Sequence, residues 1–169
     1  MKNLVILGAG TGGTMMANHM IKKLPKDHWK ITVVDQFRTH YYQPGFLFLP
    51  FDMYKSKDVK KKGGKFIPKG VNYIIQKIEK VIPEKNTVVL ENETLNYDIL
   101  IIATGTKIAP EETEGMQEPE WHKSILIFIS LKVPKPCETS CVSGKEENWL
   151  FILLKCLQNA LLHHLNLPF

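Results

Sequence analysis

Short apolar runs recur along the N-terminal part of the chain, separated by polar or glycine-containing segments. Residues 3–7, 31–35, 71–75 and 99–102 are rich in Val, Ile and Leu, and the first two of these runs end at a glycine and at an acidic residue. Continuous apolar runs of this length are typical of strands buried on both faces of a parallel sheet. The pattern therefore predicts a central parallel sheet.

The segment between the first two runs has the spacing of a helix. Over residues 12–24, the side chains of Met16, His19, Met20 and Leu24 fall on roughly one face. A strand, a glycine turn, a helix and a second strand together make a βαβ unit. The predicted fold class is therefore α/β.

Two other regions differ from this pattern. Residues 37–65 are rich in aromatic residues, Pro, Gly and Lys, and we expect them to be irregular. Polar turns around residues 84–86 and 91–93 separate β-rich stretches and predict a hairpin-like pair of strands.

A G-x-G-x-x-G pattern follows the first predicted strand, with glycines at positions 8, 10 and 13. In a dinucleotide-binding loop the first glycine allows a tight turn, the second lets the backbone approach a pyrophosphate, and the third lets helix and strand pack closely. The helix N-terminus then offers free N–H groups to the phosphates. The positions expected to contact the nucleotide are Gly8, Ala9, Gly10, Thr11, Gly12 and Gly13.

Asp35 ends the second predicted strand, where a carboxylate can accept hydrogen bonds from ribose hydroxyls. The weaker alternative is a purely structural glycine turn with a surface aspartate. Together the loop and Asp35 predict dinucleotide binding, but they leave open which dinucleotide is bound.

A second motif bears on that choice. Residues 94–106 read TLNYDILIIATGT, an apolar run that ends in the turn Ala103-Thr104-Gly105. This segment resembles the second motif of the two-dinucleotide flavoproteins, in which an Ala-Thr-Gly turn passes close to the flavin nucleotide. The resemblance implies that FAD is the cofactor and that these three residues lie near it.

The segment HYYQPGFL at residues 40–47 narrows the resemblance. It is similar to the Tyr-Gln-Pro segment of sulfide:quinone oxidoreductases and flavocytochrome c sulfide dehydrogenases, which runs beside the flavin. The resemblance implies near-flavin positions for Gln43 and Pro44, and we also assign Ile78 to the cofactor site. The alternative is that Tyr41, Tyr42 and Phe46 are simply core residues under a long loop.

The resemblance covers residues 2–124 and implies an incomplete Rossmann-like FAD-binding domain, the N-terminal fragment of a sulfide:quinone oxidoreductase-like protein. Intact relatives pass electrons from sulfide through FAD to a membrane quinone. No catalytic residue and no metal ligand is assigned in this chain, which we expect to be inactive. The alternatives are a fragment of a type II NADH:quinone oxidoreductase and a non-redox nucleotide-binding module.

Residues 125–169 do not resemble the family and hold all three cysteines, Cys137, Cys141 and Cys156. Codons for residues 144–169 can be chosen so that a frame starting on the third base of each codon reads KGGKLAIYIAEMPTKCPVAPLEFAF. That string is similar to a family continuation with its Lys-Cys-Pro segment. We therefore expect this tail to result from a frameshift near Ile125; the alternative is a genuine divergent tail.

The remaining composition bears on partners and location. The net charge is +5, and many of the cations lie in one lysine-rich run that we expect to be a solvated loop. No aromatic residues interleave with the run, so no nucleic-acid partner is predicted. The chain has no signal peptide and no apolar stretch of spanning length, which predicts a cytoplasmic protein, peripheral at most at the inner face of a membrane. The lysines of the run are Lys55, Lys57, Lys60, Lys61, Lys62 and Lys65.

Overall fold

The structure is a computed structural model that describes residues 1–49, 53–106 and 109–112. These residues belong to two compact units. The first unit comprises residues 1–42 and 60–108, and the second comprises residues 43–59 and 109–169. The predicted domain boundary after residue 124 and the predicted frameshifted tail lie outside the described residues.

A four-stranded parallel sheet forms the centre of the first unit. Its strands are β1 (Lys2–Leu7), β2 (Trp29–Asp35), β5 (Asn72–Ile75) and β9 (Ile99–Ile102), in the order β5-β2-β1-β9. All three pairings are parallel. The predicted α/β fold with a central parallel sheet is confirmed.

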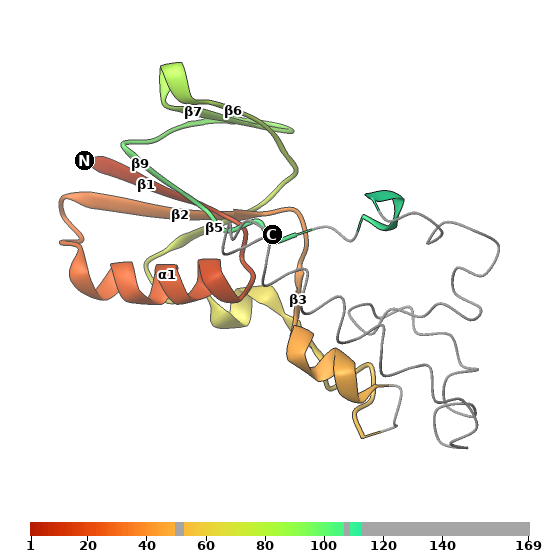
Figure 1. Ribbon diagram of the computed structural model, residues 1–169. Helices are drawn as coiled ribbons and strands as arrows, with labels where there is room; N and C mark the ends of the chain where they lie inside the picture. The colour runs from red at the N-terminus through yellow and green to blue at the C-terminus, as the bar shows by residue number, and fades with distance from the viewer. Residues whose placement is uncertain (50–52, 107–108, 113–169) are drawn as a thin grey trace, which may run out of the picture. The chain divides into compact units, whose positions relative to one another are not determined.

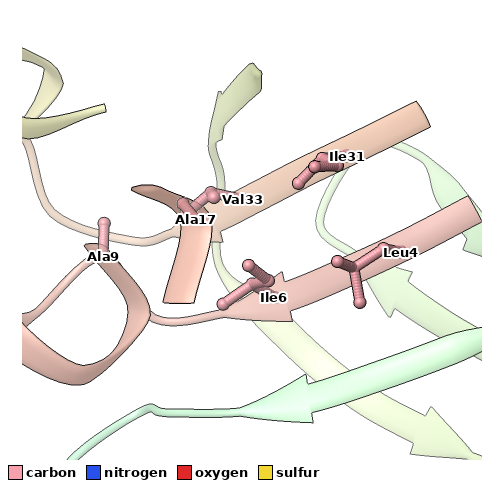
Figure 2. Packing of buried hydrophobic residues seen from close by; sticks show 6 residues of the cluster. All are labelled: Leu4, Ile6, Ala9, Ala17, Ile31 and Val33. Atoms are coloured by element: carbon pink, nitrogen blue, oxygen red, sulfur yellow. The ribbon is translucent and has the colours of Figure 1, made fainter. Parts of the chain in front are cut away.

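One face of this sheet is covered by the helix α1 (Thr11–Lys23), as Figure 1 shows. Side chains from β1, β2, α1 and the glycine loop form a buried cluster between helix and sheet (Figure 2). Of the four residues predicted to lie on one face of the helix, His19 is exposed and does not share the packing of Met16, Met20 and Leu24. The inward positions are Gly13, Thr14 and Ala17, and Met16, Met20, Ile21 and Leu24 pack at the edge of the cluster.

The opposite face of the sheet carries a three-stranded antiparallel sheet (Figure 1). Its strands are β6 (Ile78–Ile82), β7 (Thr87–Leu90) and β8 (Thr94–Asn96). The short helix η3 (Pro83–Lys85) joins the first two, and the predicted hairpin is confirmed. A second buried cluster fills this layer, and its members are Val5, Leu7, Val34, Val88 and Leu90.

The segment predicted to be irregular contains regular structure. Strand β3 (Thr39–Tyr41) pairs with β4 (Lys60–Lys62) as an antiparallel ribbon, and η2 (Gly63–Phe66) follows. All three residues of β4 are exposed lysines, so no apolar alternation marked it as a strand. The ribbon was therefore not predicted, because β4 has no buried side-chain face that would mark it in the sequence.

The described part of the second unit contains η1 (Gln43–Phe48) and η4 (Pro110–Glu112). Within it the rings of Phe48 and Tyr54 lie 5.4 Å apart. Phe46 is buried, whereas Tyr41 and Tyr42, which belong to the first unit, are exposed. The core alternative for the Tyr-Gln-Pro segment therefore fits Phe46 but neither tyrosine.

Replacing Ile6 tests how much the central strand contributes to stability. Ile6 is 0% exposed, and Ile6→Ala should lower the free energy of unfolding of the 169-residue chain by about 2–5 kcal/mol through lost burial and a cavity. Met15→Ala, at a side chain 66% exposed, should change it by no more than about 0.5 kcal/mol. Urea unfolding followed by circular dichroism measures both, and equal losses in the two variants would contradict this packing.

Candidate functional site

The carboxyl ends of the central strands meet at one edge of the sheet, and the residues after them form the candidate site. The Ala103 N–H donates to the Leu7 carbonyl at 2.7 Å, and the Gly8 N–H donates to the Val34 carbonyl at 2.7 Å. The parallel ladders thus continue past the strand ends. They bring the glycine loop, Asp35 and the Ala103-Thr104-Gly105 turn together, although these segments are far apart in the sequence.

Backbone atoms approach so closely here that replacing either of two glycines would force the neighbouring backbone to shift. Gly8 has a φ of +98°, and a Cβ on it would overlap the carbonyl oxygen of Ala103. A Cβ on Gly13 would overlap the carbonyl oxygen of Gly8. Gly8 and Gly13 therefore have the turn and packing roles that the motif assigned to them.

Gly10 differs from these two glycines because the space around it is open. A Cβ on Gly10 would meet no described atom within 4 Å. Gly10 is the N-cap of α1, the cap has no side-chain hydrogen bond, and the first turn carries no acidic residue. The first N–H groups of a helix have no partner within the helix, so this end suits a phosphate.

Asp35 makes contacts that the sequence did not predict. One carboxylate oxygen, Oδ2, accepts the Ala9 N–H at 2.6 Å, and the other, Oδ1, accepts the Phe37 N–H at 2.8 Å. The carboxylate therefore holds the glycine loop against the turn that follows β2. Ribose binding by Asp35 stays a prediction.

His40, in β3, is a second side chain that contacts the glycine loop, and the sequence pattern assigned it no role of its own. Its Nδ1 lies 3.1 Å from the Ala9 carbonyl oxygen. The residue is 31 positions away from Ala9, so no local pattern signals this contact.

The other predicted positions divide between the two units. Gly12 faces the Ala103 side chain, with 3.8 Å from an ideal Cβ to the alanine Cβ, and Gly105 has a φ of +76°. Ile78 begins β6 and packs against the second buried cluster. Gln43 and Pro44 begin η1 in the second unit, and their place beside a flavin stays a prediction.

Tyr73, in β5, contacts the turn that follows β2. Its hydroxyl donates to the Phe37 carbonyl at 3.4 Å. Burial raises the pKa of Tyr73, the negative charge of Asp35 raises it further, and Arg38 lowers it in part.

The residues that the structure describes contain no group of three or more His, Cys, Asp or Glu side chains that could hold a metal ion. Among them, no helix is long and apolar enough to cross a membrane.

The fold and the edge of the sheet define a Rossmann-like dinucleotide-binding domain. Residues 2–129 match the family described as pyridine nucleotide-disulphide oxidoreductase. The chain therefore belongs to the pyridine nucleotide-disulphide oxidoreductase family. Within it, the chain is similar to sulfide:quinone oxidoreductases, which confirms the resemblance stated from the sequence.

One sequence relative and two solved structures illustrate this similarity. The mitochondrial sulfide:quinone oxidoreductase of Dictyostelium discoideum is 30% identical over 116 residues, which cover 68% of this chain and 25% of that protein. The sulfide:quinone oxidoreductase of the hyperthermophilic bacterium Aquifex aeolicus has a TM-score of 0.66 at 24% identity, covering 85% of this chain and 32% of that one. NDH2 from Plasmodium falciparum has a TM-score of 0.54 at 21% identity, covering 69% of this chain and 25% of that one. The two structural likenesses show the fold, and this chain spans a third or less of each relative's length.

The raised pKa of Tyr73 predicts a pH dependence of stability. Because the folded state holds this proton more tightly than the unfolded state, the contribution is fully present below the ordinary tyrosine pKa of about 10. It is lost as the pH rises through the folded pKa. Denaturant unfolding between pH 8 and 11 should therefore show a steeper loss of stability in the wild type than in Tyr73→Phe. Parallel curves for the two proteins would rule the shift out.

Proposed function

We propose that this chain binds the ADP half of FAD at the carboxyl edge of its parallel sheet, as part of a sulfide:quinone oxidoreductase-like flavoprotein. The observation that carries the proposal is the contact between Gly8 and the Ala103-Thr104-Gly105 turn. The Ala-Thr-Gly sequence of that turn is the feature that resembles the second motif of the two-dinucleotide flavoproteins. Membership of the family and similarity to sulfide:quinone oxidoreductases support FAD over other dinucleotides.

Each part of the site has a role in this proposal. The open N-terminus of α1 takes the pyrophosphate, and Gly10 allows the close approach. Asp35 accepts the ribose hydroxyls while it holds Ala9, because each carboxylate oxygen has two lone pairs. Ala103, Thr104 and Gly105 border the nucleotide on the β9 side.

The activity of the whole protein is proposed from the relatives. FAD supplies the redox chemistry, and sulfide and a quinone are the substrates named for the Dictyostelium and Aquifex proteins. A cytoplasmic protein at the inner face of a membrane would meet a lipid-soluble quinone there. The printed 169 residues have no cysteine before Cys137, and we propose that this chain alone does not oxidise sulfide.

Gly10→Ala tests the nucleotide site without disturbing the fold. The added methyl meets no described atom within 4 Å, and the backbone at Gly10 is extended, with φ −69° and ψ −167°. The methyl would occupy the space through which the phosphates approach. We expect FAD and ADP to bind the variant at least about tenfold more weakly, measured by calorimetric titration of the 169-residue chain.

Gly13→Ala is the contrasting variant, because its methyl overlaps the Gly8 carbonyl. It should lower the unfolding free energy, whereas Gly10→Ala should not. Failure of the wild type to bind either FAD or ADP would refute the proposal, as would equal affinity in Gly10→Ala. A preference for ATP or NAD⁺ over FAD would favour the non-redox nucleotide-binding module instead.

The proposed lack of activity is tested with the FAD-loaded chain. Addition of sulfide under nitrogen should leave the flavin absorbance near 450 nm unchanged, whereas dithionite should bleach it. Bleaching by sulfide at a rate above that of free FAD would show that the chain oxidises sulfide by itself.

A further inference from the structure

Both backbone polar groups of Ala9 are held by side chains from distant parts of the chain. The Ala9 N–H donates to Asp35 Oδ2 at 2.6 Å, and the Ala9 carbonyl oxygen lies 3.1 Å from His40 Nδ1. Ala9 is 4% exposed, so water has little access to replace either partner. The loop is therefore fixed from two sides before any ligand binds.

The ring of His40 is itself fixed by its neighbours. It packs against the ring of Phe66, with centroids 4.6 Å apart and planes at 45°. The Phe66 carbonyl accepts the Asn18 Nδ2–H of α1 at 2.9 Å. The β3–β4 ribbon also constrains the backbone of His40, which pairs with Lys61. Thus the residue that packs against the ring is tied to α1, and the backbone of His40 is tied to β4.

The chemistry of this contact determines which ring nitrogen carries the hydrogen that faces Ala9. A carbonyl oxygen only accepts hydrogen bonds, so Nδ1 of His40 must carry the proton. The accepting carbonyl belongs to the same peptide plane as the Gly10 N–H, and in a trans peptide the two groups point in opposite directions. Holding the Ala9 carbonyl therefore sets the direction of the Gly10 N–H.

We propose that His40 is a positioning residue of the nucleotide site, which orients the Ala9–Gly10 peptide so that the Gly10 N–H faces the phosphates. Gly10 has no Cβ and open space around it, so without His40 this peptide could rotate at little steric cost. Asp35 holds the preceding peptide plane, through the Ala9 N–H, and cannot prevent that rotation. The inferred effect of His40 on nucleotide binding rests on the proposed function, whereas the hydrogen bond between His40 and Ala9 does not.

The hydrogen bond is tested first, without a ligand. In ¹⁵N-labelled 169-residue chain, long-range ¹H–¹⁵N correlation spectra distinguish the two neutral tautomers of each histidine. We expect the Nδ1-protonated form for His40. His40→Phe, which keeps the contact with Phe66, should shift or broaden the amide signals of the glycine loop. An Nε2-protonated ring, or unchanged loop amides in His40→Phe, would overturn the inference even if FAD binds.

Binding then tests the positioning role. His40→Phe should weaken FAD and ADP binding about three- to tenfold, the range expected for one lost hydrogen bond. His40→Asn, whose side-chain N–H can replace Nδ1–H, should recover part of the affinity. His19→Phe, at an exposed histidine of α1, should bind like the wild type.

The outcomes separate this inference from the proposed function. A wild type that binds neither FAD nor ADP contradicts the function, and the ligand-free spectra then decide whether His40 holds the loop. A wild type that binds, together with His40→Phe of equal affinity, contradicts the positioning role and leaves the function intact. A purely structural His40 would lower stability in both His40 variants and show no recovery of affinity in His40→Asn.

Discussion

Close backbone contact at the carboxyl edge of the sheet is the constraint on which the rest of the first unit depends. Gly8 touches the Ala103 carbonyl, and Gly13 touches the Gly8 carbonyl, at distances that exclude any Cβ. These contacts set where α1 begins relative to β1 and how near the β9 turn comes to the loop. A side chain at either glycine would push helix or strand outward and open the edge where the candidate site lies.

The layers follow from this placement of β1 in the middle of the sheet. With β2 on one side and β9 on the other, β1 has no free edge. Its side chains alternate between the two clusters, Leu4 and Ile6 facing α1, and Val5 and Leu7 facing the antiparallel sheet. A strand buried in this way must be apolar at successive positions, which is why its signal in the sequence is so clear.

The sequence predicted those parts of the fold whose causes are local. The central strands, α1, the β6–β7 hairpin and the glycine loop all carry their signals within a few residues. The β3–β4 ribbon carries no such local signal, because its lysines are exposed and its pairing joins segments about 20 residues apart in the sequence. The spacing of Met16, His19, Met20 and Leu24 did not reveal the innermost face of α1, because that face carries the small residues Gly13 and Ala17, which let the helix approach the sheet.

The candidate site shows the same division between local and distant causes. The glycine motif marks residues whose roles are steric and can be inferred from type and spacing alone. Asp35 was predicted from its position, yet its contact with Ala9 was not, since that contact exists only when β1 and β2 pair in this register. Asp35 and His40 hold the loop in the absence of a ligand, so the entropy of ordering it is lost on folding rather than on binding. Residues that shape a loop in this way need not touch the ligand, and a motif defined by ligand contacts will not reveal them.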